Sequence, residues 1–392
     1  MSPFDDRSPP GIRPGVAALD ASLIGEVAKL GFGHPDVLPL WFGEGNEPTP
    51  GFICEAAASA LRAGETFYTF ELGIPPLREA LAAYETGLYA KPVDAGRIAV
   101  TSSGMQGIFL TVQSIVDPGD NVLVVSPVWP NIRHAIEIFG GEARDVALGR
   151  TNDGGFRLDI DALEARLDPR TKAVFVNSPS NPTGWCASRD EAQAILDFTR
   201  RHGLWLIADE VYARIVYDQR VAPSFLDLIE PDDRVVVVNS FSKSWAMTGW
   251  RLGWLVVPQD WQRMLGKLVQ YNTSGAPTFI QHAGVVAVTE GESFIATMNA
   301  RYRAGRDLTV DRLGSLPGVR LRAPDAAFYA FVQIEGLTDS LEFAKRILAE
   351  TRVGVAPGAA FGLGGEGHLR LCFAASGDRL EPALDRLARF LG

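Results

Sequence analysis

The middle of the chain alternates short runs of apolar residues with longer amphipathic segments. Several runs, such as Val235-Val236-Val237-Val238, contain no polar residue, which is typical of a strand covered on both faces. We predict strands at 97–101, 121–126, 171–177, 204–209, 234–239 and 251–257, and helices at 106–116, 131–139, 159–167 and 188–202. This rhythm predicts an α/β fold with a doubly wound, mainly parallel sheet and helices on both sides.

From about residue 279 the pattern becomes that of an α+β unit. We predict helices at 279–289, 292–316 and 340–350, strands at 319–322, 328–334 and 368–373, and a closing amphipathic helix through Leu380, Leu384, Leu387 and Leu391. The stretch up to about residue 42 is rich in Pro and Gly, and we expect it to pack against this unit as an arm with one helix. The expected parts are therefore 1–45 (arm and part of a small domain), 46–280 (large domain) and 281–392 (small C-terminal domain).

Composition narrows the class of protein. The 392 residues carry a net charge of −10 with scattered Lys and Arg, which disfavours nucleic acid as a partner. Three distant cysteines and five histidines without ligand spacing predict neither disulfides nor a metal site. No apolar run approaches the roughly 20 residues that cross a bilayer. The opening Met1-Ser2-Pro3-Phe4-Asp5-Asp6 lacks the pattern of a secretion signal, so we expect a cytoplasmic protein without a membrane partner.

The most informative segment follows the run of four valines. It reads Asn239-Ser240-Phe241-Ser242-Lys243 and continues to Gly249-Trp250-Arg251. A lysine at the mouth of a sheet loses its proton more readily when it is desolvated, and a neutral amine can form a Schiff base. The Ser240 hydroxyl and the Arg251 guanidinium suit a phosphate. Taken alone, the segment is equally compatible with a surface lysine at a strand-to-loop junction.

Three further strand ends carry polar groups, and ligands bind at such ends in open α/β sheets. Asp209 ends an apolar strand and could keep a cofactor ring nitrogen protonated, with Tyr212 as a hydrogen-bond donor nearby. Asn181 lies in the rigid turn Asn181-Pro182-Thr183-Gly184. The segment Ser103-Gly104-Met105 opens a helix, where free N–H groups bind anions. Each is also a common capping or turn pattern.

Two residues complete the set. Trp129 follows a strand and could stack on a planar ring, although a core aromatic residue would look the same. Arg370 alternates with apolar neighbours on a short strand, where its guanidinium could grip a carboxylate or simply face water.

In this order, these motifs resemble the class I/II aminotransferases, the fold-type I enzymes dependent on pyridoxal 5'-phosphate. The resemblance runs from Leu40-Trp41-Phe42-Gly43-Glu44-Gly45, through Tyr68 and the Gly73–Arg78 stretch, to Arg370. It implies a mainly parallel, seven-stranded-type sheet in a large domain, with a smaller α+β domain. The chain departs from the commonest pattern at Gly45-Asn46-Glu47-Pro48 and at Met105 and Gly107, which weakens any inference about the substrate side chain.

The resemblance also implies the role of each residue. Lys243 would form the Schiff base and move a proton, Asp209 would pair with the ring nitrogen, and Tyr212 and Asn181 would contact the ring's phenolate oxygen. Trp129 would stack on the ring, and the phosphate would lie among the backbone of Ser103, Gly104 and Met105, the side chains of Ser240 and Arg251, and Tyr68 from the partner subunit of a homodimer. Arg370 and Asn181 would hold the substrate carboxylate beside the Gly43 backbone.

The implied activity is transamination between an L-amino acid and a 2-oxo acid by a ping-pong mechanism. A lyase acting by β-elimination or decarboxylation on the same fold, and a non-catalytic cofactor-binding module, are the alternatives. Ser240-x-x-Lys243 also matches the serine acyl-enzyme motif, but the companion SDN and KTG motifs are missing. Gly362–Gly367 matches GxGxxG but precedes a strand, so it is interpreted as a loop. The amino donor stays open, with Arg133 as a candidate for binding a distal carboxylate.

Overall fold

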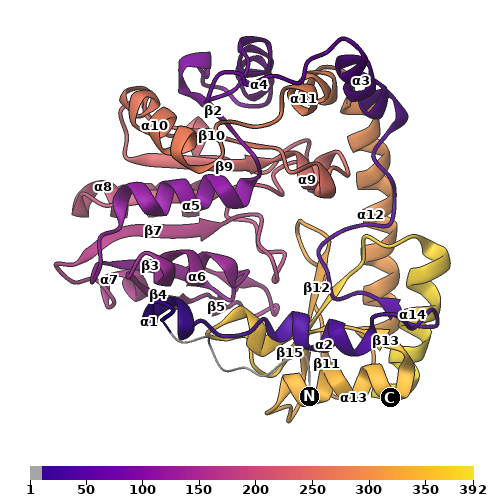
Figure 1. Cartoon of the computed structure of the whole chain (residues 1–392). Helices are drawn as coiled ribbons and strands as arrows, with labels where there is room; N and C mark the ends of the chain where they lie inside the picture. The colour runs from indigo at the N-terminus through magenta and orange to yellow at the C-terminus, as the bar shows by residue number, and fades with distance from the viewer. Residues whose placement is uncertain (1–10) are drawn as a thin grey trace.

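The computed structural model describes residues 11–392, and a seven-stranded sheet forms the centre of its larger domain (Figure 1). The neighbouring strands β9, β8, β7, β3 and β4 run parallel, whereas β10 is antiparallel to both β9 and β2. The prediction of a mainly parallel sheet is therefore confirmed. In spatial order the strands are β2 (Ile98–Thr101), β10 (Gly253–Val256), β9 (Val235–Ser240), β8 (Trp205–Asp209), β7 (Thr171–Asn177), β3 (Asn121–Ser126) and β4 (Glu142–Ala147).

Helices cover both faces of this sheet, which explains its unbroken apolar strands. Val235 and Val237 pack into one hydrophobic cluster, while Val236 and Val238 pack into another on the opposite face. Successive side chains of a strand point to opposite faces, so a strand between two cores must be apolar throughout. One face carries α5 (Gly104–Ile115), α6 (Asn131–Ile138) and α10 (Gln262–Asn272), and the other carries α4 (Pro75–Leu88), α7 (Ile160–Glu164), α8 (Arg189–His202) and α11 (Thr278–Glu290).

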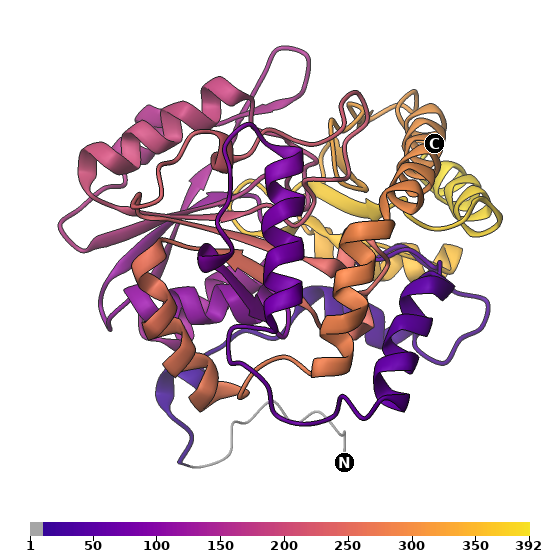
Figure 2. The ribbon, with the colours of Figure 1, turned by 90° about the horizontal axis from the view of Figure 1, so that it is seen from above.

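Among the elements that were not predicted from the sequence, the longest are the strand β4 and three helices. The residues of β4 mix charged and apolar side chains, and only Val146 is buried. Because β4 lies at an edge of the sheet, it has a single neighbouring strand and needs no apolar run. These three helices are α3 (Gly51–Arg62), α4 and α10; α3 and α4 both pack against α11 (Figure 2).

A four-stranded antiparallel sheet organises the smaller domain. Its strands, in spatial order, are β11 (Val319–Arg320), β12 (Tyr329–Ile334), β15 (His368–Cys372) and β14 (Ala356–Pro357). Its main helices are α12 (Glu292–Leu313), α13 (Ser340–Thr351) and α14 (Gly377–Leu391). Figure 1 shows α12 running along one side of the molecule from the larger domain to the smaller one.

The N-terminal stretch lies against this smaller domain. The helix α2 (Leu23–Gly31) packs on α13 and β14, and β1 (Leu38–Pro39) pairs in parallel with β13 (Val353–Gly354). The opening Met1–Asp6 lies outside the described residues, and the domain limits at 45 and 280 stay predictions. Among residues 11–392, no helix is both long and apolar enough to cross a membrane.

A buried carboxyl group under the larger sheet makes the stability of the protein depend on pH. Glu85 is 1% exposed; its Oε1 accepts a hydrogen bond from Trp254 Nε1 at 2.9 Å, and its Oε2 has no partner. Burial raises the pKa of Glu85 from 4.5 to about 7. The protonated form therefore favours folding, and its contribution to stability is complete below pH 4.5 and is lost as the pH rises through 7.

Replacing Glu85 by Gln is expected to raise the free energy of unfolding at pH 8 by about 2–3 kcal/mol, because a neutral amide avoids ionisation of the buried group. At pH 4.5 the gain should disappear. Urea denaturation at both pH values measures this change in the free energy of unfolding. Glu79→Gln, at an exposed position of the same helix, is the control. Equal effects of Glu85→Gln at the two pH values would contradict this explanation.

Candidate active site

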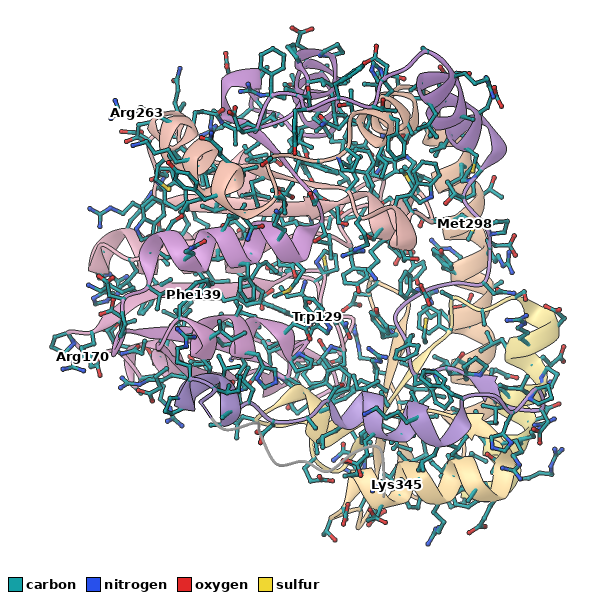
Figure 3. The ribbon with its side chains drawn as sticks, in the orientation of Figure 1. Trp129, Phe139, Arg170, Arg263, Met298 and Lys345 are labelled. Atoms are coloured by element: carbon teal, nitrogen blue, oxygen red, sulfur yellow. The ribbon has the colours of Figure 1, made fainter. Side chains whose placement is uncertain are left out.

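A cavity of about 250 Å³ opens where the carboxyl ends of β7, β8 and β9 face the smaller domain. Figure 3 labels Trp129 at this side of the larger sheet. Most of the residues singled out in the sequence line the cavity, although they come from separate parts of the chain: Gly43, Gly104, Met105, Trp129, Asn181, Asp209, Tyr212, Ser240, Lys243, Arg251 and Arg370.

Lys243 reaches the cavity from a short helix that begins directly after the buried strand β9. Ser240 caps this helix, α9 (Phe241–Ser244), by accepting a hydrogen bond from the Ser242 N–H at 3.1 Å. The Lys243 Nζ atom donates to the Gly43 carbonyl at 2.8 Å. Burial lowers the pKa of Lys243 from 10.5 to about 8. The amine is therefore neutral more often near neutral pH than an exposed lysine would be, which favours nucleophilic attack.

Asp209 ends the neighbouring strand β8 and is 4% exposed. Its carboxylate accepts a hydrogen bond from the Val211 N–H at 3.3 Å and forms no ion pair with a Lys or Arg of residues 11–392. Burial raises the pKa of Asp209 to about 7, and the positive charge of Lys243 acts in the opposite direction. A cationic group placed against this carboxylate would restore its ionised form.

Asn177 fastens the end of β8 to the turn that contains Asn181. It lies opposite Asp209 in the register of β7 and β8, and its Nδ2 donates to the Asp209 carbonyl at 3.0 Å. Its Oδ1 accepts from the Asn181 N–H at 2.8 Å, and the Asn181 carbonyl accepts from the Trp129 N–H at 2.9 Å. These bonds position Asp209, Asn181 and Trp129 relative to one another.

A tyrosine pair connects the two domains inside the cavity. The hydroxyl oxygens of Tyr212 and Tyr329 lie 2.7 Å apart, and either can donate to the other. Burial raises the pKa of both tyrosines, so both hydroxyls keep their protons. A Cβ atom added to Gly43 would come 2.0 Å from the Tyr329 hydroxyl oxygen. Only glycine therefore fits at position 43, where the carbonyl receives the Lys243 hydrogen bond.

Arg370 is a buried cation without a carboxylate partner among the described residues. It is 2% exposed, donates through Nη1 to Asn181 Oδ1 at 3.1 Å, and lies over the Tyr329 ring at 4.6 Å. A second guanidinium nitrogen donates to the Trp41 carbonyl, and Nε has no partner. Because neutral oxygens do not balance a buried guanidinium, this position favours binding of a carboxylate from a ligand.

The start of α5 provides a site for an anion. Ser103 caps the helix by accepting from the Gln106 N–H at 3.0 Å, and the N–H groups of Gly104 and Met105 donate to no group in residues 11–392. The Ser103 side chain is therefore used as a cap, and Ser103 lies outside the cavity lining. A Cβ atom on Gly253 would come 2.6 Å from the Gly104 nitrogen, so glycine in β10 lets the helix start approach the sheet.

Arg251 lies just before β10 and lines the same cavity. Its backbone is left-handed, with φ of 55°, and its Nη1 donates to the Thr248 carbonyl at 2.6 Å. It forms no ion pair with a carboxylate in the described chain, so its charge is available to an anion. The strand predicted at 251–257 is shorter, Gly253–Val256. The left-handed backbone of Arg251 still belongs to the preceding turn, so pairing with β2 and β9 begins only at Gly253.

Besides Ser103, two residues singled out in the sequence do not line the cavity. Tyr68 is 94% exposed and does not line the cavity of its own chain. Arg133 pairs with Asp145 and donates to the Ala143 carbonyl at 3.3 Å, also outside the cavity. Arg133 is therefore not free to bind a distal carboxylate, because Asp145 of β4 already balances its charge.

The cavity also contains residues that were not predicted: Ile24, Trp41, Phe42, Ile108, Asn177, Val211, Ser242 and Tyr329. Asn177 could have been found, because it ends a parallel strand beside Asp209. Tyr329 and Ile24 come from the smaller domain and from α2, and no local motif marks either of them.

A two-domain α/β fold with a buried lysine, a buried carboxylate and an anion-binding helix start in one cavity defines a fold-type I pyridoxal-phosphate-dependent transferase. These features fit the cofactor: Asp209 lacks a cationic partner, the Gly104 and Met105 N–H groups lack acceptors, and the Lys243 amine has a lowered pKa.

Comparison with known proteins gives the family. The family model described as "Aminotransferase class I and II" matches residues 39–387. The chain is 32% identical to an aspartate aminotransferase of Pyrococcus horikoshii, over 96% of each chain, and 34% identical to aromatic-amino-acid aminotransferase 2 of Thermococcus litoralis, over 95% of this chain and 96% of that protein. A single mutant of Thermus thermophilus aspartate aminotransferase superposes with a TM-score of 0.90 at 32% identity, covering 97% of this chain and 100% of the mutant.

The chain belongs to the class I/II aminotransferases. It is a pyridoxal-phosphate-dependent enzyme that transfers an amino group between an amino acid and a 2-oxo acid. The resemblance identified in the sequence is thus confirmed, and the lyase alternative is not favoured.

Proposed function

We propose that Lys243 is both the covalent attachment point of the cofactor and the proton-transferring base of the reaction. The observation that carries this proposal is the single cavity lined by the Lys243 amine, the Asp209 carboxylate and the Arg370 guanidinium. Burial brings the pKa of Lys243 to about 8, so the amine can accept and return a proton near neutral pH.

The remaining site residues hold the cofactor in place. When bound, pyridoxal phosphate supplies an electron-withdrawing ring that stabilises negative charge at the substrate Cα. Asp209 would hold a proton at the ring nitrogen, Tyr212 and Asn181 would contact the phenolate oxygen, and Trp129 would cover one face of the ring. Ser240, Arg251 and the N–H groups at the start of α5 would bind the phosphate.

Arg370 and Asn181 bind the α-carboxylate of the substrate and so place its Cα near Lys243. The 3.1 Å bond between Arg370 Nη1 and Asn181 Oδ1 orients the guanidinium before the substrate arrives. The Tyr329 ring, 4.6 Å from the guanidinium, excludes water from one side. The hydrogen bond from Lys243 Nζ to the Gly43 carbonyl holds the amine in the cavity that Arg370 also lines.

The proposed working form is a cytoplasmic homodimer. Phe67, Tyr68 and Tyr271 are 83%, 94% and 83% exposed, which is costly for large aromatic side chains in a monomer. Tyr68 would then enter the cavity of the partner subunit and contact the phosphate there. Three free cysteines are compatible with a reducing compartment.

A half-reaction tests the ping-pong course of the reaction, and the Lys243→Ala variant tests the role of the lysine. Mixing the holoenzyme with an amino acid and no 2-oxo acid should release one equivalent of 2-oxo acid per active site and then stop, because the amino group stays on the enzyme. Adding a second 2-oxo acid should restart turnover. Continuous product formation without an acceptor would indicate a lyase and contradict the proposal.

A further inference from the structure

Three cationic side chains line the cavity. Each of them has a partner group on the cofactor or on the part that all amino acid substrates share. Lys243 is the amine of the reaction, and Arg370 with Asn181 serves an α-carboxylate. Arg251 lines the same cavity as Ser240, Gly104 and Met105, and the proposed function assigns it to the phosphate. No other Lys or Arg of residues 11–392 lines the cavity, so this chain offers no further cation to a second carboxylate.

The exposed surface beside the start of α5 adds no cation either. Gln106 Nε2 donates to Asn272 Oδ1 at 2.8 Å, which joins the end of α10 to α5. Thr278 Oγ1 donates to the Phe67 carbonyl at 3.1 Å, which joins the start of α11 to the segment before α4. The sequence has no Lys or Arg at 63–77 or at 268–300. The exposed side chains of these segments include Phe67 and Tyr271. A partner subunit that used these segments would bring aromatic rings to the cavity.

The other cavity walls are apolar and come from both domains. Ile24 of α2 and Ile108 of α5 are 8% and 1% exposed. Met105 packs against the hydrophobic cluster that contains Ile108. Phe42 is 41% exposed, and its ring lies 6.1 Å from that of Trp41. A thioether and two aromatic rings favour contact with flat or bulky apolar groups.

We infer that the amino donor has a large uncharged apolar side chain, and that Met105 is a specificity-determining residue. This inference rests on the proposed function, in which Arg370 takes the α-carboxylate and Lys243 faces the amino group. The side chain of the substrate must then lie against the remaining walls, whose apolar residues include Ile24, Phe42, Met105 and Ile108. A second carboxylate would lose its hydration there without gaining a cation, whereas an aromatic or branched aliphatic group would gain by burial.

Single-turnover measurements on the holoenzyme test the inference. The second-order rate constants of the half-reaction with phenylalanine and leucine should exceed those with aspartate and glutamate by a factor of about 100, equivalent to about 2.7 kcal/mol in the barrier. Calorimetry supplies a readout without turnover: 3-phenylpropionate should bind the holoenzyme at least about tenfold more tightly than succinate. Aspartate reacting as fast as phenylalanine, or succinate binding as tightly as 3-phenylpropionate, would overturn it.

A pair of variants on α5 tests the role of Met105. Met105→Lys places a cation in the apolar wall and should raise the aspartate-to-phenylalanine ratio of rate constants at least about tenfold. Gln113→Lys adds the same charge at an exposed position of the same helix and should leave the ratio unchanged. An unaltered ratio in Met105→Lys, with cofactor absorbance retained, would refute this role.

The outcomes separate the two proposals. If no amino acid yields a 2-oxo acid, the proposed function fails, and the inference about the donor fails with it. If dicarboxylic amino acids react readily while phenylalanine and leucine do not, the proposed function stands and only the inference fails.

Discussion

Replacing Lys243 by alanine is expected to lower kcat by a factor of about 10⁴, because one side chain supplies both the nucleophile and the base. The absorbance of the covalently attached cofactor should disappear as well. Steady-state transamination and the visible spectrum of the purified protein measure the two effects. Lys243→Arg should be equally inactive, since a guanidinium keeps the charge but does not lose its proton near neutral pH.

Lys267→Ala is the matched control, since Lys267 is exposed on α10 and lies outside the cavity. It should keep full activity and the cofactor spectrum. A Lys243→Ala protein that folds and retains more than about a tenth of the activity would show that another group provides the base, because loss of such a group costs far more than tenfold.

Replacing Asp209 by asparagine is expected to lower kcat by a factor of about 10³, because a neutral amide cannot hold a positive charge at the ring nitrogen. Burial raises the pKa of Asp209 to about 7, although the positive charge of Lys243 acts in the opposite direction. A protonated ring nitrogen next to the carboxylate would lower that pKa and keep the pair charged. The amide matches the carboxylate in size, so thermal stability should change little while transamination falls.

Two further variants separate charge from shape. Asp209→Glu keeps the negative charge and should retain more activity than Asp209→Asn. Asp232→Asn makes the same chemical change at an exposed position and should leave kcat unchanged. If Asp209→Asn were as active as the unaltered protein, ring protonation would depend on a different group.

The larger sheet could be predicted because each buried strand carries an apolar run that points into two cores. The strands Asn121–Ser126 and Thr171–Asn177 have the predicted limits for this reason. The edge strand β4 escaped because Glu142, Arg144 and Asp145 remain partly or fully exposed, so that no apolar run marks it. Edge position is a property of the assembled sheet and leaves no such pattern in the sequence.

The cavity residues also divide into those that a sequence pattern reveals and those that only the packing of the domains brings together. Asp209 and Asn181 follow strands of the parallel sheet, and the rule that carboxyl ends share one edge brings them together. Tyr329, Phe42 and Ile24 arrive from the smaller domain and the N-terminal stretch, so only the packing of the two domains places them. The ion pair of the candidate Arg133 could not be foreseen, because its partner, Asp145, lies on β4, which was not predicted.

The covalent bond between the cofactor and the protein offers the most direct test. Reducing the holoenzyme with borohydride fixes the cofactor to its lysine, and peptide mapping by mass spectrometry then identifies the residue. The label should lie on the peptide containing Lys243 and be absent from every other lysine. Stoichiometric label on another lysine, or a holoenzyme that carries no label at all, would contradict the assignment of the active site.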